Sequence, residues 1–175
     1  EFEREMRNRG VGLMARISTI WSETPNVRVE TVAREGRITT YYHTPAGTVF
    51  TETKTHVDRE IAAGGSLGTG GMIKGVEDYD PVLFMIEDTV YHADDSIYYN
   101  QVRDLGGDGI VRDSVFASAY SATRPFFGSL YGLEPWINAQ YEHPDHFAKL
   151  VEALERRNER MLPLILASPA EFVGG

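Results

Sequence analysis

Hydrophobic residues recur at helical spacing in four stretches of the chain. Over residues 3–21 they stand at roughly helical intervals among Arg and Glu, which predicts an amphipathic helix that the Thr24-Pro25-Asn26 turn ends. The same spacing predicts helices over 81–91 and over 97–105. The clearest pattern covers residues 145–162, where one face is apolar and the remainder is charged. Helices are therefore expected near both ends of the chain.

Extended patterns lie between these helices. Residues 27–53 contain three runs rich in valine, threonine and tyrosine with turn residues between them, which predicts an antiparallel β-meander. An apolar triplet bounded by glycine predicts a buried strand at 109–112. Residues 162–166 fit either a buried strand or the last turns of a helix kinked by Pro163. The order of these elements predicts an α/β fold with an appended antiparallel β-meander.

The composition is that of a globular domain and narrows the choice of partners. The chain has 175 residues, of which 42% are hydrophobic and 25% charged. A formal net charge of −9 argues against nucleic acid and against acidic membranes, because both need a cationic surface. No apolar run approaches the roughly 18 residues that span a bilayer, so we expect no membrane partner and a cytoplasmic protein. The absence of cysteine excludes disulfides and thiolate metal ligands.

Three motifs have a structural interpretation that outweighs the chemical one. The glycine-rich run 64–71 could cradle a phosphate, but no Gly-Lys-Ser/Thr follows it, so a loop is expected. His143 and His146 have a spacing found in metal sites but lack a third ligand, so we expect no metal in this chain. Asp94 and Asp95 fit a helix cap better than a pair of catalytic carboxylates.

Candidate binding residues follow the predicted strand at 109–112. Binding loops of strand-to-helix units lie at the carboxyl end of the strand, so chemistry is expected there. The candidate substrate-binding residues are polar or charged: Arg112, Asp113, Tyr120 and Arg124. Arginine suits a carboxylate, and the hydroxyl of Tyr131 can donate a proton or a hydrogen bond. Two alternatives stay open, namely that Tyr131 is a core aromatic residue and that Arg112 pairs with Asp113.

Four segments, taken in order, resemble the uroporphyrinogen decarboxylase superfamily, particularly its methyltransferase-like branch. They are YYHTPAGTVFTE, KGVEDYDPVLFMIEDT, GDGIVRDS and FFGSLYGLEPWINAQYEHPDHFAKLVEALE, and together they cover most of residues 11–172. The resemblance implies a (β/α)₈ barrel of the TIM type, of which residues 1–175 would form a single partial domain at the N-terminal end. It would comprise an N-terminal helix in 1–26, the meander at 27–53 and the start of the barrel at 76–175.

The resemblance also implies a function. The family's decarboxylases carry a tyrosine in a segment similar to Leu130–Glu134, which makes Tyr131 the candidate catalytic residue. Their arginine-rich N-terminal motif has no counterpart here, so corrinoid-linked methyl transfer is expected rather than porphyrinogen decarboxylation, a lyase reaction. The full-length family member would use zinc and a corrinoid protein, with zinc ligands from the later half of the barrel and no cofactor held by this chain. The alternative is a non-catalytic binding or assembly module derived from the same fold.

A partial barrel would leave strand edges and apolar helix faces uncovered. We therefore expect the isolated chain to be inactive and to associate, either with itself as a homo-oligomer or with the missing half of the barrel. A small-molecule substrate or a corrinoid protein would be the functional partner.

Overall fold

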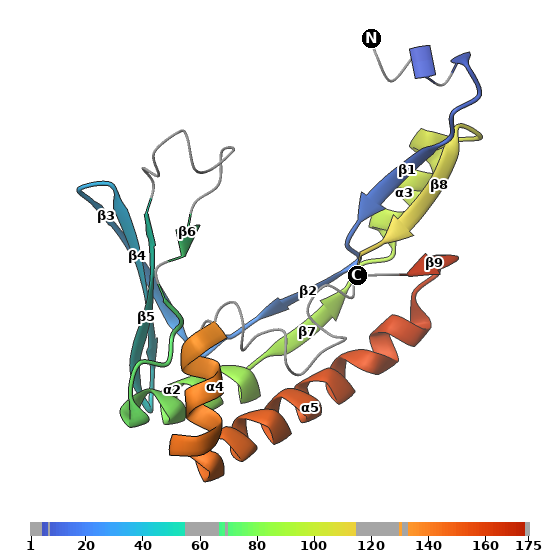
Figure 1. Cartoon of the computed structure of the whole chain (residues 1–175). Helices are drawn as coiled ribbons and strands as arrows, with labels where there is room; N and C mark the ends of the chain where they lie inside the picture. Colours follow the sequence, from blue (N-terminus) through green and yellow to red (C-terminus); the bar gives the residue numbers. More distant parts are fainter. Residues whose placement is uncertain are drawn as a thin grey trace. The chain divides into compact units, whose positions relative to one another are not determined.

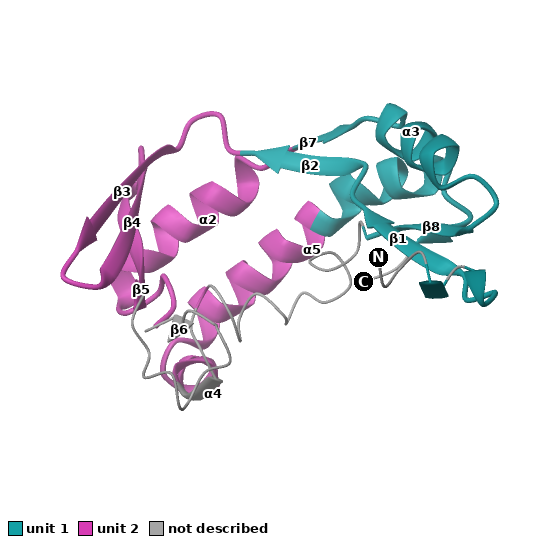
Figure 2. Cartoon of the chain, turned by 90° about the horizontal axis from the view of Figure 1, so that it is seen from above, with its two compact units in different colours: residues 1–23, 91–120, 158–175 teal, residues 24–90, 121–157 magenta. Residues whose placement is uncertain are grey.

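The computed structural model describes residues 5–6, 8–54, 67–68, 70–114, 130 and 133–173, with backbone alone at 67–68 and 133–134. These residues belong to two compact units, coloured separately in Figure 2. The first comprises residues 1–23, 91–120 and 158–175, and the second comprises residues 24–90 and 121–157. Each unit therefore gathers segments that are distant in the sequence.

The first unit is built on a parallel sheet. Strands β1 (Leu13–Ile17), β8 (Gly109–Asp113) and β9 (Phe172–Val173) lie in the order β1-β8-β9, and both neighbouring pairs are parallel (Figure 1). Helix α3 (Ser96–Leu105) contacts β1 and β8. A separate two-stranded ribbon pairs β2 (Ile20–Glu23) with β7 (Val90–Ala93). The unit is thus of the α/β class.

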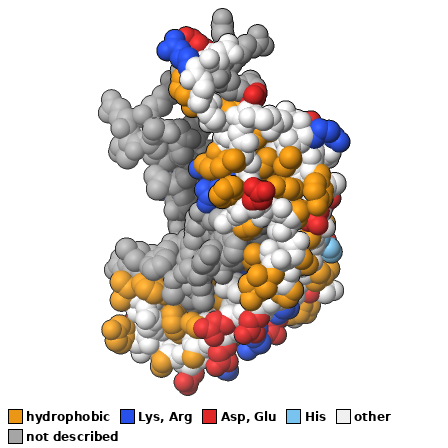
Figure 3. All heavy atoms as spheres, turned by 90° about the vertical axis from the view of Figure 1, so that its right-hand side faces the viewer, with side chains coloured by type: hydrophobic (Ala, Val, Ile, Leu, Met, Phe, Trp, Pro, Cys, Tyr) orange, Lys and Arg blue, Asp and Glu red, His pale blue; other side chains and the backbone are white. Residues whose placement is uncertain are grey.

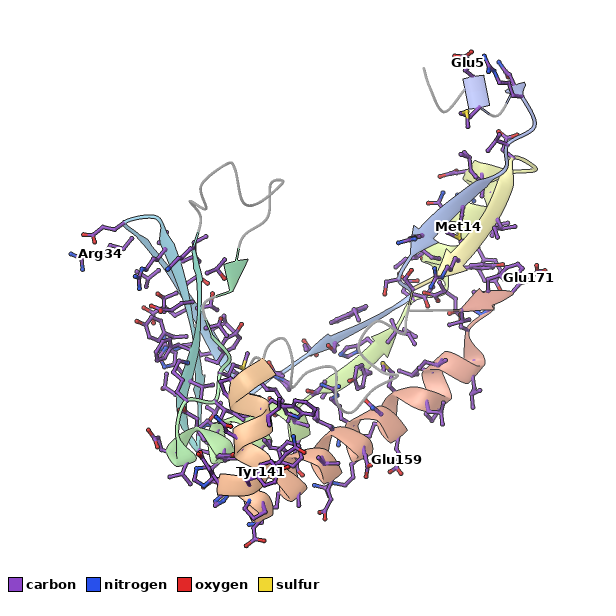
Figure 4. All side chains as sticks on the ribbon, viewed as in Figure 1. Glu5, Met14, Arg34, Tyr141, Glu159 and Glu171 are labelled. Atoms are coloured by element: carbon purple, nitrogen blue, oxygen red, sulfur yellow. The ribbon has the colours of Figure 1, made fainter. Side chains whose placement is uncertain are left out.

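The two faces of the parallel sheet differ in burial. Side chains alternate between faces along a strand, and on one face Val111 and Asp113 are buried. Val173 shares this face and packs on the buried Met161 and Ile165 from the last turns of α5 (Pro144–Ala167). The opposite face carries exposed Met14, Ile110 and Phe172. Figure 4 labels Met14 on β1, and Figure 3 shows that hydrophobic side chains are also visible among charged ones on the molecular surface.

The second unit contains the antiparallel sheet. Strands β3 (Arg28–Arg34), β4 (Arg37–Thr44), β5 (Gly47–Lys54) and the short β6 (Leu67–Gly68) follow in sequence order. The two residues that join β3 to β4, Glu35 and Gly36, have φ of 50° and 74°, as a type I′ hairpin turn requires. The helical elements are η1 (Val76–Asp78), α2 (Tyr79–Glu87), α4 (Leu133–Glu142) and the first turns of α5.

One hydrophobic core joins these helices to the sheet. Its buried members come from β5, the loop before η1, α2, α4 and α5: Val49, Ile73, Tyr79, Val82, Ile86, Leu130, Ala139, Leu150, Ala153 and Leu154. Val49 and Val82 are each only 1% exposed, so α2 covers one face of the antiparallel sheet. The other face of the sheet, which carries Tyr41 and Phe50, does not contribute to this core.

Several predicted elements match these bounds. The meander expected over 27–53 is β3 to β5, and the buried strand expected at 109–112 is β8. The helix expected from residue 145 is α5, which continues through Pro163 to Ala167. Met161 and Ile165 flank that proline and are both buried, so packing supports the last turns despite the missing N–H. The assignment of the whole chain to one partial barrel domain stays a prediction.

The predicted N-terminal helix over residues 3–21 is wrong for most of its length, although residues 5, 6 and 8 are helical. Residues 13–17 and 20–23 are strands β1 and β2. Burial alternates along β1 with a period of two, and every residue of β1 pairs with β8, from Leu13 opposite Gly109 to Ile17 opposite Asp113. This pairing with a strand distant in the sequence overrides the local helical spacing, and glycines 10 and 12 had already weakened the helix.

Candidate functional site

The carboxyl ends of the three parallel strands meet at one edge of their sheet. Ile17 of β1, Asp113 of β8 and Val173 of β9 are paired in register there. The backbone N–H of Ser114 donates to the carbonyl oxygen of Ile17 at 2.7 Å and holds the two longer strands together at this edge. Ligands of α/β proteins bind at the carboxyl edges of parallel strands, so this edge is the first candidate site.

Asp113 is the polar centre of this edge. Its side chain is completely buried, and its nearest partner, Thr19, is only 1% exposed. The Thr19 backbone N–H donates to Oδ1 at 3.2 Å, and the Thr19 hydroxyl donates to Oδ2. The hydroxyl of Ser168, between α5 and β9, donates to Oδ2 at 3.1 Å. One carboxylate therefore ties together the segments that follow β1, end β8 and precede β9.

This geometry determines what Asp113 can do. A buried carboxylate must be paired to compensate for its desolvation, and both oxygens of Asp113 accept hydrogen bonds from the protein. The group is enclosed, so in this arrangement a substrate does not reach it. Asp113 is placed to hold the strand ends and their loops in position. Its predicted role as a substrate-binding residue stays a prediction.

The other predicted site residues are distributed differently. Arg112 precedes Asp113 on β8, so strand alternation places it on the opposite face, in register with Arg16 of β1. The structure therefore does not bring Arg112 and Asp113 together as an ion pair. Tyr120, Arg124 and Tyr131 lie outside the described residues, and their predicted roles stay predictions.

A pocket in the second unit was not anticipated from the sequence. It has a volume of about 280 Å³ and lies between the loop before η1 and one face of α4. Its walls combine apolar and polar residues: Ile73, Lys74, Gly75, Tyr79, Pro135, Asn138, Ala139, Glu142 and His143. The α4 members are spaced three or four residues apart, which was a sequence signal for one shared face. Nothing in the sequence, however, indicated that residues 73–75 would lie opposite them.

Lys74 is held tightly at this pocket. Its Nζ donates to the carbonyl oxygens of Phe50 at 2.7 Å, Gly71 at 3.0 Å and Met72 at 3.4 Å. The same nitrogen lies 3.8 Å from the centre of the Phe50 ring, a cation–π contact. Asp78 Oδ2 accepts from the backbone N–H groups of Lys74 at 2.8 Å and Gly75 at 3.1 Å. The ammonium group thus fastens the loop to the sheet.

Burial lowers the pKa of Lys74 from its ordinary 10.5, while the carboxylates of Asp78 and Glu52 act in the opposite direction. Between the lowered pKa and 10.5, the unfolded chain holds a proton at this lysine that the folded chain has lost. The free energy of unfolding should therefore rise with pH in the alkaline range just below 10.5.

Urea unfolding of the parent chain and of the Lys74→Met variant measures this effect. The difference in unfolding free energy, parent minus variant, should increase as the pH is raised toward 10.5, because the variant has no ammonium group to titrate. Lys54→Met, at an exposed lysine on β5, is the matched control and should leave the parent's pH dependence in place. A difference that stays flat or falls across this range would contradict the assignment.

The described residues contain no group of three His, Asp or Glu side chains that could hold a metal ion. His143 and His146 lie instead beside Tyr79, with ring centres 6.0 Å and 4.9 Å from the tyrosine ring. His143 lies between the end of α4 and the start of α5. The two imidazoles therefore serve as packing partners of a core tyrosine.

Comparison with known proteins identifies no relative. No family model, no curated protein and no solved structure matches this chain. Across the described ranges, none of the helices has the length and apolar character needed to cross a membrane.

Proposed function

We propose that this chain is the N-terminal part of a uroporphyrinogen decarboxylase-like enzyme, acting in corrinoid-linked methyl transfer rather than in porphyrinogen decarboxylation. The observation that carries the proposal is the strand order β1-β8-β9. The three strands are parallel, and their order across the sheet is the same as their order along the chain. Helix α3 precedes β8 and helix α5 precedes β9. This is the order in which a (β/α)₈ barrel begins.

The burial of the sheet supports the same proposal. Barrel strands have one face toward the surrounding helices and the other toward the barrel interior. Here one face carries buried Val111 and Asp113, while the opposite face carries exposed Met14, Ile110 and Phe172. Further strands of a full-length protein would enclose the exposed face. The antiparallel meander of β3 to β5 would then be an appendage inserted between the first two barrel strands.

In this proposal the site residues have distinct roles. Asp113 positions the loops at the carboxyl edge through Thr19 and Ser168. Tyr131 is the proposed catalytic residue, and Arg112, Tyr120 and Arg124 are proposed to bind the substrate. The residues described do not fit a catalytic zinc, since no three ligands come together among them. Zinc ligands would have to come from a later part of a longer protein.

The product of the complete reading frame tests this proposal. Continuation past Gly175 into a His-x-Cys and later Cys pattern is expected, and the purified protein should transfer the methyl group of methylcobalamin to a small thiol. Replacing Tyr131 by phenylalanine should lower turnover by about 100-fold, because only the hydroxyl that assists proton transfer is lost. The melting temperature should stay nearly unchanged, because the ring and its packing remain.

Two results would count against methyl transfer. One is a full-length protein that leaves methylcobalamin intact in the presence of thiol. The other is a Tyr131→Phe variant with parental turnover, which would remove the catalytic role of that tyrosine. Decarboxylation of a porphyrinogen by the same preparation would instead indicate that the protein acts as a decarboxylase of this superfamily.

A non-catalytic binding or assembly module is the second candidate. The hydrogen bonding of Asp113 favours it, because this buried carboxylate at the strand edge accepts hydrogen bonds from the protein itself through both of its oxygens. A reading frame that stops at residue 175 would support this candidate.

A further inference from the structure

Strand β3 forms an open edge of the antiparallel sheet. The sheet order is β3-β4-β5-β6, and in the part of the chain that the structure describes no strand pairs with the outer side of β3. All seven of its residues, Arg28–Arg34, are exposed. Pairing with β4 runs from Arg28 opposite His43 to Arg34 opposite Arg37 without a bulge. The edge therefore lacks the bulges and prolines that commonly prevent strand addition.

The hairpin turn determines which backbone groups this edge offers. A two-residue turn is closed by a pair that exchanges both hydrogen bonds, and here that pair is Arg34 and Arg37. Bonding alternates along the strand, so Arg34, Val32 and Glu30 direct their N–H and C=O groups toward β4. Val29, Thr31 and Ala33 direct theirs outward. These three residues can accept another strand without any loss to the hairpin.

We propose that this edge binds a second copy of the same chain, with β3 antiparallel to β3 across a two-fold axis. In the proposed register, Thr31 of each copy exchanges hydrogen bonds with Ala33 of the other. Val32 then lies opposite Val32 at the axis, and Glu30 of each copy lies opposite Arg34 of the other. Figure 4 shows Arg34 at the end of β3, pointing away from the sheet.

Charge complementarity favours this register over the two that shift the pairing toward Arg28. Shifting the pairing so that Thr31 meets Thr31 places Arg28 opposite Arg34, and a further shift places Glu30 opposite Glu30. Like charges directly opposite each other on neighbouring strands destabilise a sheet, whereas opposite charges stabilise it. The proposed register forms two Glu30–Arg34 pairs by symmetry and covers Val32, which is 42% exposed in the single chain. The inference is independent of the proposed function.

Cysteine cross-linking of the 175-residue chain tests the register, since the chain has no cysteine of its own. Residues opposite each other in a pair without backbone hydrogen bonds have Cβ atoms close enough for a disulfide. Val32→Cys should therefore give a disulfide-linked dimer under mild oxidation. Val29→Cys is the matched control, at an exposed valine that lies about six positions from its own copy, or roughly 20 Å. Val32→Cys should cross-link at least about tenfold faster.

A charge exchange gives a second test, with sedimentation as the measurement. Glu30→Arg alone places Arg opposite Arg34, and Arg34→Glu alone places Glu opposite Glu30, so each variant should dimerise at least about tenfold more weakly than the parent chain. Mixing the two variants restores both opposite-charge pairs and should restore the dimer. Glu30 also contacts Arg28 at 3.2 Å and His43 at 3.4 Å within its own hairpin. Mixing does not restore those contacts within each hairpin. Recovery of the dimer in the mixture would therefore be due to charge pairing between the two chains.

Three outcomes would overturn the inference. The first is a parent chain that sediments as a monomer at about 100 μM. The second is a Val32→Cys variant that cross-links no faster than Val29→Cys. The third is a dimer that persists in both charge variants, because such a dimer would form through another surface. Circular dichroism of each variant should match the parent chain, and Val32→Cys retains a small apolar side chain that suits the folded hairpin.

Discussion

Replacing Asp113 by alanine should lower the free energy of unfolding by about 3 kcal/mol. The change removes the acceptor for the Thr19 backbone N–H, the Thr19 hydroxyl and the Ser168 hydroxyl. Thr19 is almost fully buried, so its donors would find no water in compensation. Chemical unfolding, followed by far-ultraviolet circular dichroism, measures the loss.

Single-donor variants serve as controls for Asp113. Thr19→Val and Ser168→Ala each remove one hydroxyl and leave the carboxylate with other partners, so each should cost about 1 kcal/mol. The loss of unfolding free energy in Asp113→Asn should lie between those of the single-donor variants and that of Asp113→Ala. The amide retains one acceptor oxygen, but its NH₂ group faces existing donors. An alanine variant as stable as the parent chain would show that the carboxylate does not hold the strand ends together.

A second large loss is expected for Gly109→Ala, about 3 kcal/mol. Gly109 lies opposite Leu13 in the parallel pairing of β1 and β8. A Cβ at this glycine would lie 2.7 Å from both the backbone nitrogen and the carbonyl carbon of Leu13, and closer still to its carbonyl oxygen. Backbone atoms cannot rotate away as a side chain can, so the two strands would have to separate at this point.

Gly107→Ala is the matched control, two residues earlier. An added Cβ there meets no atom within 4 Å, so the unfolding free energy should change by less than about 0.5 kcal/mol. Urea titrations of the two variants measure the contrast. Equal stability of Gly109→Ala and Gly107→Ala would mean that β1 does not approach β8 at Leu13.

The local signals in the sequence predicted the local structure well. A hairpin is specified here by residues close together in the sequence, namely the Glu35-Gly36 turn and the β-branched and aromatic residues on either side of it. Strands β3 and β4 form this hairpin. The apolar face of residues 145–162 likewise predicted α5. In both cases the information lies within a few residues of the element it determines.

The remaining features depend on contacts between residues far apart in the sequence, which local patterns do not reveal. Residues 13–17 have helical spacing, yet they form β1 because β8 provides a partner strand nearly a hundred positions away. The position of Asp113 after the predicted strand at 109–112 predicts a binding residue. Its burial depends on Thr19, 94 positions earlier, and on Ser168, 55 positions later, and no spacing rule links these residues. The pocket beside Lys74 depends on a similar meeting of separate segments.

The division of the first unit among three segments has a consequence for the order of folding. Its parallel sheet joins residues from the beginning, the middle and the end of the chain, so its contacts require the closure of long loops. The meander closes through two short turns, and such local hairpins form in microseconds. During synthesis β3 to β5 can form as soon as they emerge, whereas β1 must wait for β8, and β8 must wait for β9. The edge of β3 would thus be exposed early, while β1 still lacks its partner strand.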